Sequence, residues 1–140
     1  MDTAAPLRSV RLDPAAVHRV LDWLDANCRE PADELRSDPR YTYRCSTVRA
    51  RMLQPGATTY STFQVTTRDI CRSGVSFIHG GFVHATTQCT VALQDVEGNW
   101  VVRKGQVARC FHAQGLIHLV GVKFEDEMDV ELFIALPKAK

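Results

Sequence analysis

Long apolar runs are missing from this sequence of 140 residues. Its first fifteen residues contain no apolar core of the length that signal peptides need, and no later window approaches the roughly 20 apolar residues of a membrane-spanning helix. We therefore predict a cytoplasmic protein without membrane insertion.

An excess of basic residues is missing as well. The chain has 17 Lys and Arg against 16 Asp and Glu, which gives a formal net charge of +1 at pH 7. Proteins that hold a long phosphate backbone usually carry a strong positive excess. We therefore expect no nucleic acid polymer as a partner, and any anion that is bound should be small and held locally.

The pairing that cysteines need in disulfide frameworks and zinc sites is not found. The five cysteines are an odd number without a CxxC pair, and the neighbours Cys110 and His112 lack the spacing of tetrahedral ligands. Cys71, between Arg68 and Arg72, is a candidate thiol nucleophile, but no third group is identifiable as an orienting partner. We predict free thiols, no metal, no catalytic residue and no enzyme.

An amphipathic helix is predicted near the amino end. Asp13 is placed as the N-cap, and Pro14 occupies the first helical position. One apolar stripe follows at helical spacing: Val17, Val20, Leu21 and Leu24. The helix should run from residue 14 to 27 or 28, within an N-terminal helical appendage and linker over residues 1–38.

After Pro39 the pattern changes to alternating, β-branched and aromatic residues. We predict strands over 43–53, 59–68, 74–79, 88–95, 99–111 and 116–124. The turns "QPGA", "EGN" and "HAQG" each contain a glycine that can take a positive φ. Since closure removes exposed edges, residues 39–140 are predicted to form a six-stranded antiparallel β-barrel, followed by a short C-terminal helix within 126–140.

Two arginines, Arg40 and Arg44, lie four apart in "RYTYR", where the helical section meets the first strand. Pro39 and the residues between the arginines favour extended backbone, so a shared helical face is excluded. A guanidinium fits a phosphate or the O6/N7 edge of guanine with two hydrogen bonds. The pair is therefore predicted to clamp a phosphorylated guanine nucleotide, unless both side chains merely lie along the barrel surface.

A second polar stretch, "RDICRSGVSF" over residues 68–77, is predicted to interrupt the strand pattern as a turn. Asp69 can accept hydrogen bonds from N1 and N2 of guanine, and Gly74 lets a ligand approach the backbone. The alternative is a plain polar turn, with Asp69 capping backbone amides and Gly74 at positive φ.

The order and spacing of the two stretches resemble the PilZ domain family. Its pattern is RxxxR followed by [D/N]xSxxG, and Arg40 and Arg44 match the first motif while Asp69 and Gly74 match the second. The resemblance covers about residues 39–135. It implies a six-stranded barrel with a C-terminal helix, and binding of the bacterial second messenger cyclic di-GMP by these residues.

The match fails at Cys71, where the family has serine. A thiol is the poorer hydrogen-bonding group, so the exchange should cost about 0.5–1.5 kcal/mol of binding free energy. The resemblance implies a non-enzymatic receptor or adaptor without a cofactor, which passes the signal to a protein partner. The alternative is a degenerate PilZ-like interaction module that does not bind the nucleotide.

Overall fold

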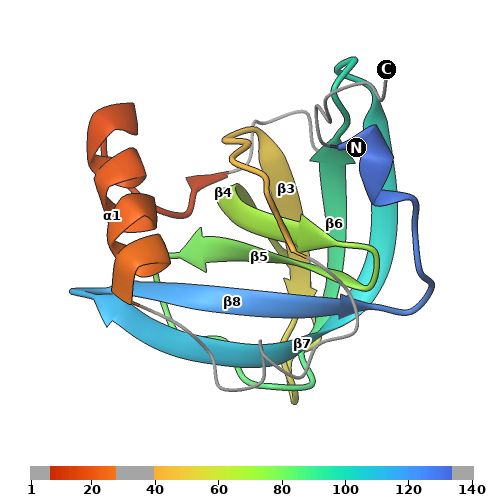
Figure 1. Cartoon of the computed structure of the whole chain (residues 1–140). Coiled ribbons are helices and arrows are strands. Elements are labelled where there is room, and N and C mark those ends of the chain that lie inside the picture. Colours follow the sequence, from red (N-terminus) through yellow and green to blue (C-terminus); the bar gives the residue numbers. More distant parts are fainter. Residues whose placement is uncertain (1–6, 28–39, 134–140) are drawn as a thin grey trace, which may run out of the picture.

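The computed structural model describes residues 7–27 and 40–133, which form one α-helix, eight strands and a 3-10 turn (Figure 1). The elements are β1 (Leu7–Arg8), α1 (Pro14–Asn27), β2 (Tyr41–Thr42), β3 (Val48–Leu53), β4 (Ser61–Cys71), β5 (Gly74–His79), β6 (Gln88–Gln94), β7 (Trp100–Gln114), β8 (Ile117–Phe124) and η2 (Val130–Leu132). The protein is mainly β, as predicted.

Strands β3 to β8 close into a six-stranded antiparallel barrel. Their order is β4-β3-β6-β7-β8-β5, and β5 pairs with β4 to complete the ring. Alternate side chains point inward and form the main core around Phe77, which is fully buried. The predicted barrel is thus confirmed. Two short strands that were not predicted also pair with β4, β1 near the start of that strand and β2 near its end.

Helix α1 packs on the outside of the barrel. It begins as predicted, with the Asp13 carboxylate accepting a hydrogen bond of 2.8 Å from the Ala16 N–H. Its buried stripe contacts Ile78 of β5 and Leu119 of β8, and in Figure 1 the helix stands at one end of these two strands. The stripe comprises Val17, Val20, Leu21 and Leu24. Within the described ranges, no helix is long and apolar enough to cross a membrane.

Strand β4 is longer than predicted. It continues through Cys71, and Cys71 pairs with Gly74. The predicted interruption between the two strands is therefore too long, because residues 69–71 belong to β4 and only Arg72 and Ser73 connect it to β5. Strand β5 itself has the bounds that were predicted, 74–79. The end of β4 was predicted too early because polar residues on the outer face of β4 look like turn residues in the sequence, where the pairing with β5 is not visible.

The first long strand begins later than predicted, at Val48 instead of residue 43. Tyr43 is buried in the main core, and its hydroxyl donates a 2.6 Å hydrogen bond to the carbonyl of Gln94. The Cys45 N–H donates to the Thr67 hydroxyl at 2.9 Å. Residues 43–47 are therefore a loop that is held against the barrel by these side-chain bonds and by two backbone hydrogen bonds with β4, from the Tyr43 N–H to the Arg68 carbonyl and from the Thr67 N–H to the Cys45 carbonyl, both 3.1 Å long.

The predicted C-terminal helix is reduced to the single 3-10 turn η2 in the part that is described, and residues 134–140 lie outside the described residues. Met128 and Phe133 both reach the barrel core, with the Phe133 ring 5.7 Å from that of Tyr43. The Asp129 carboxylate accepts from the N–H of Glu131, which caps the turn. The segment thus covers part of the core without a longer helix.

The three predicted turn glycines are confirmed. Gly56, Gly98 and Gly115 have φ angles of 83°, 85° and 51°. Side chains rarely adopt this left-handed region, so glycine fixes the hairpin connections of the barrel.

Candidate functional site

The outer face of β4, β5, β8 and β7 is organised in rows, because residues in register on neighbouring strands lie side by side. We name each row by its β4 or β5 residue. The Cys71 row is Cys71, Gly74, Lys123 and Gln106; the Asp69 row is Asp69, Ser76, Gly121 and Arg109; the Ile78 row is Thr66, Ile78, Leu119 and Phe111.

A cavity of about 400 Å³ lies over the first two rows. Four of the five predicted site residues line it: Arg40, Asp69, Cys71 and Gly74. Ser76 and Gly121 line it from the middle of the Asp69 row, where their small side chains leave the space open. Two sequence stretches that were predicted to act together therefore meet at one cavity.

A β-bulge explains how Asp69 reaches the cavity. The register of β4 against β5 shifts between Thr67 and Asp69, so Arg68 is an extra residue in the strand. Bulges re-aim side chains and are common next to functional sites. Here Asp69 lines the cavity, whereas the side chain of Arg68 contacts α1.

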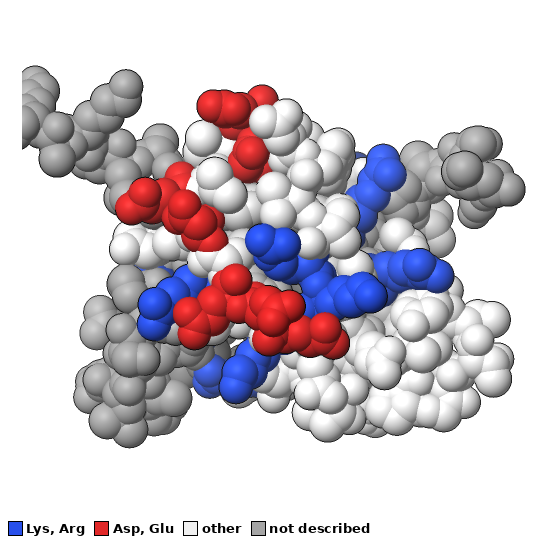
Figure 2. Space-filling model, turned by 90° about the vertical axis from the view of Figure 1, so that its right-hand side faces the viewer, with Lys and Arg blue, Asp and Glu red and all other residues white. Residues whose placement is uncertain are grey.

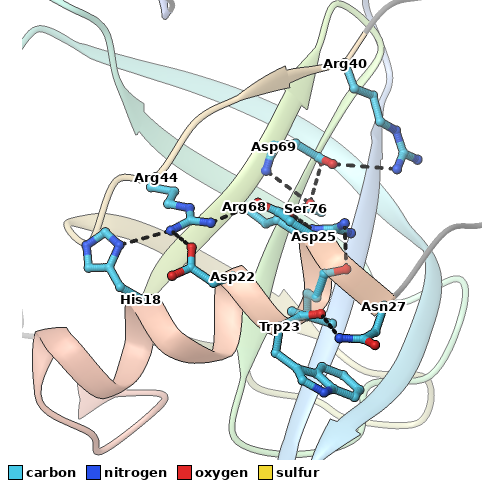
Figure 3. Close-up of polar contacts among 11 residues, drawn as sticks. His18, Asp22, Trp23, Asp25, Asn27, Arg40, Arg44, Arg68, Asp69 and Ser76 are labelled. Atoms are coloured by element: carbon cyan, nitrogen blue, oxygen red, sulfur yellow. Dashed lines mark hydrogen bonds and ion pairs between the residues drawn. The ribbon is translucent and has the colours of Figure 1, made fainter.

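The Asp69 carboxylate is held by two neighbours (Figure 3). The Ser76 hydroxyl donates a 2.6 Å hydrogen bond to Oδ1, and the same hydroxyl oxygen lies 3.3 Å from the Asp69 N–H. The Arg40 Nη1 lies 3.7 Å from Oδ2, which is an ion pair but longer than a hydrogen bond. Arg40 thus balances the charge of Asp69 without a tight contact between them.

Strand β2 positions Arg40. Tyr41 pairs with Ile70 and Thr42 pairs with Asp69, so the residue before β2 is brought to the edge of the cavity. The side chain of Arg40 is 22% exposed, and that of Asp69 is 18% exposed. Both charged groups are therefore partly shielded from water, which strengthens their interaction with an anionic or polar ligand.

Arg44 is not part of this cavity, and its side chain points to α1 (Figure 3). Its guanidinium forms 2.9 Å ion pairs with Asp22 and with Asp25, and it lies 3.2 Å from Nδ1 of His18. Burial lowers the pKa of Arg44, but the hydrogen bonds and charges of the two aspartates outweigh burial and raise the pKa above its ordinary value. The two arginines of "RYTYR" thus serve different surfaces.

Arg68 completes the contact with α1. Its Nε lies 2.9 Å from Asp25, and its Nη2 donates a 3.3 Å hydrogen bond to the Leu24 carbonyl in the last turn of the helix. A cation at a helix C-terminus is favourable, because the carbonyl groups there carry partial negative charge. Arg44 and Arg68 together bind α1 to the barrel.

Cys71 is the last residue of β4 and Gly74 is the first residue of β5, so the two flank the turn of this hairpin. The Cys71 side chain is buried, and its Sγ lies 3.3 Å from the Ser73 hydroxyl. A Cβ added to Gly74 would collide with the carbonyl oxygen of Val122, and Gly74 is not among the glycines with positive φ. Close approach of β5 and β8 therefore requires this glycine, and the alternative of a positive φ is wrong.

Sequence reasoning missed the cavity residues on the far strands β7 and β8, among them Arg109, Lys123 and Gly121. A glycine within the strand pattern "LIHLVGVKF" was a usable signal, since such glycines mark close approach of a backbone or a ligand. Arg109 gave no signal, because only the register of β7 against β8 brings it beside Gly121.

Charges of opposite sign are mixed on the face shown in Figure 2, where acidic side chains lie directly against basic ones. The structure also has an ion pair between Arg72 and Glu127, with 3.4 Å between Nε and Oε2. Among the residues that the structure describes, no group of three or more His, Cys, Asp or Glu side chains is placed to hold a metal ion.

Comparison with protein-family models gave no match to this chain, and comparison with curated proteins gave none either.

Proposed function

We propose that this chain is a non-enzymatic bacterial receptor that binds cyclic di-GMP in the cavity over the Asp69 and Cys71 rows. The observation that carries the proposal is the meeting of Arg40 with Asp69, Cys71 and Gly74 around one cavity. These residues come from two stretches of sequence whose motifs resemble the PilZ family.

The chemistry of the lining suits a guanine nucleotide. The Arg40 guanidinium can donate two parallel hydrogen bonds to a phosphate or to the O6/N7 edge of guanine. The Asp69 carboxylate can accept from N1 and N2 of guanine, which separates guanine from adenine. The bond from Ser76 fixes the orientation of this carboxylate, so it needs little reorganisation to receive the base.

Cys71 weakens the site without removing it in this proposal. The thiol replaces a hydroxyl, so about 0.5–1.5 kcal/mol of binding free energy is lost. A micromolar complex has about 8 kcal/mol of binding free energy in total. The remaining groups therefore suffice for measurable affinity.

In this proposal, Arg44 couples nucleotide binding to the position of α1. To join Arg40 around the ligand, Arg44 must exchange the carboxylates of Asp22 and Asp25 for the ligand. Binding would thereby loosen α1 from the barrel and change the surface that a protein partner meets. A ligand can shift such an equilibrium only by its difference in affinity for the two arrangements.

A thermal-shift experiment tests the receptor. Cyclic di-GMP should raise the melting temperature progressively as its concentration increases, because it binds the native state, whereas GTP and GMP at equal concentration should raise it less. The variant Asp69→Asn keeps the size of the side chain but loses the charge, so the shift should decrease. Equal shifts with all three nucleotides would contradict a site specific for cyclic di-GMP.

A second candidate is a PilZ-like interaction module that does not bind the nucleotide. The contacts of Arg44 with the helix favour it, since they occupy one arginine of the motif. In that case no nucleotide would change the melting temperature, and Arg44→Ala would lower stability alone.

A further inference from the structure

We infer that Arg109, which pairs with Gly121, and Lys123, two residues further along β8, form the second half of the ligand site and select a dinucleotide over a mononucleotide. This inference rests on the proposed function, because it assigns further residues to the same cavity. It does not depend on Arg44, which lies outside the cavity.

The Asp69 row gives the dimension of the site. It crosses four neighbouring strands, from Asp69 through Ser76 and Gly121 to Arg109. Neighbouring strands lie about 4.8 Å apart, so the backbones at the two ends of the row are separated by about 14 Å. The residue that bears the carboxylate is therefore at one end of the row and the residue that bears the guanidinium is at the other, with Ser76 and Gly121 between them.

Both ends of the row lie beside a β-bulge. The register of β7 against β8 shifts between Val107 and Arg109, as that of β4 shifts before Asp69. The extra residue in β7, Ala108, also lines the cavity. Because bulges re-aim side chains, the paired bulges indicate a surface shaped at both edges rather than a regular sheet.

Gly121 lets the Arg109 side chain lie across β8. A Cβ built on Gly121 would have the Arg109 Cγ as its nearest neighbour, at 3.9 Å. The stem of Arg109 therefore lies within contact distance of the space above Gly121. A larger residue at position 121 would fill the floor that the ligand needs.

The charges match a cyclic dinucleotide. The cavity is lined by three cations, Arg40, Arg109 and Lys123, and by the carboxylate of Asp69. A cyclic dinucleotide carries two phosphodiester charges, so it can meet Arg40 and the β7–β8 cations together. A mononucleotide whose base is read by Asp69 reaches only one end of the row.

An aromatic ring adjoins this second half. Phe111 lines the cavity from the Ile78 row and is 37% exposed. Base–aromatic stacking tolerates any base and adds to affinity. The second base of the ligand can therefore lie against Phe111 while its phosphate meets Arg109.

The test compares the wild-type chain with Arg109→Ala by calorimetric titration with cyclic di-GMP. Loss of one charge-assisted contact should weaken binding about tenfold or more and flatten the dependence of affinity on salt concentration. Arg51→Ala, an arginine on the outer face of β3, serves as the control and should leave both quantities unchanged. GMP should bind the wild-type chain at least about tenfold more weakly than cyclic di-GMP.

A second variant separates folding from binding. Gly121→Ala should fold normally, since no other atom lies closer than ordinary contact distance to the new methyl group, yet it should weaken cyclic di-GMP binding. If the wild-type chain does not bind cyclic di-GMP, the proposed function itself fails. If it binds cyclic di-GMP more tightly than GMP but both variants keep wild-type affinity, the proposed function stands and the role of Arg109 and Gly121 is refuted.

Discussion

Two neighbouring rows on the same outer face of the barrel differ in what covers them: α1 packs on the Ile78 row, whereas the Asp69 row lies at the cavity. In the Ile78 row, Ile78 and Leu119 are 0% and 2% exposed because α1 covers them. In the Asp69 row, two residues away on the same strands, Ser76 and Gly121 occupy the equivalent positions and leave a cavity. The size of side chains at alternate positions thus decides where a helix packs and where a ligand can enter.

The same contrast separates the two arginines of "RYTYR". Arg44 forms two ion pairs of 2.9 Å with α1, whereas Arg40 stands 3.7 Å from the carboxylate of Asp69. The contacts of Arg44 hold the helix, and the ion pair between Arg40 and Asp69 lies at the cavity. An arginine that is already tightly paired must lose those bonds before it binds anything else.

The largest effect is expected on the helix-covered side. Leu21→Ala should lower the free energy of unfolding by about 2–5 kcal/mol, because Leu21 is fully buried between α1 and the barrel. Urea denaturation measures this change. Leu116→Ala, at a leucine that is 79% exposed, should change it by less than about 0.5 kcal/mol, and equal losses would contradict the packing of α1.

The two glycines on the cavity side should behave differently. Gly74→Ala should cost about 1–3 kcal/mol of unfolding free energy, because its Cβ meets the Val122 carbonyl. Gly121→Ala should stay close to wild type in the same denaturation experiment. Similar losses in both variants would mean that the strand approach at Gly74 is wrongly assigned.

In the proposed function, the aspartates of α1 and cyclic di-GMP compete for the Arg44 guanidinium. Arg44→Ala should weaken cyclic di-GMP binding at least about tenfold, because a charge-assisted bond contributes about 1.5–3 kcal/mol. Asp22→Asn should strengthen binding by up to about fivefold, since it removes one competing ion pair at an exposed site. Titration calorimetry checks both, with Asp126→Asn as a charge-matched control. Weaker binding by Asp22→Asn would argue against competition.

The smallest effect concerns pH. Burial, and then the neighbouring charge of His118, lower the pKa of His79 below its ordinary 6.5. The folded protein therefore binds the proton less readily than the unfolded chain, and stability should fall as pH decreases below about 6.5. The slope cannot exceed about 1.4 kcal/mol per pH unit for one group. Denaturation at several pH values should show this slope in wild type and lose most of it in His79→Asn.

Local patterns predicted much of this fold. The Asp13 cap and apolar stripe predicted α1, strand alternation and turn glycines predicted the barrel, and the structure confirms them. The errors came from non-local pairing. The bulge that turns Asp69 toward the cavity, and the row that joins Gly121 to Arg109, depend on strand register, which no short stretch of sequence specifies.

The sequence predicted only part of the candidate site. Motif spacing brought Arg40 and Asp69 together correctly, and the structure places them at one cavity. The direction of Arg44 could not be predicted, because it depends on two aspartates of a helix that precedes it by about twenty residues. A short polar motif identifies candidate groups, but packing decides which surface each group faces.

Calorimetric titration of the wild-type chain and Arg40→Ala with cyclic di-GMP tests the central claim most directly. We expect saturable binding to the wild-type chain and at least about tenfold weaker binding to Arg40→Ala, with both proteins melting at similar temperatures. No heat of binding in the wild-type chain, or equal affinity in the two proteins, would contradict a nucleotide site at this cavity.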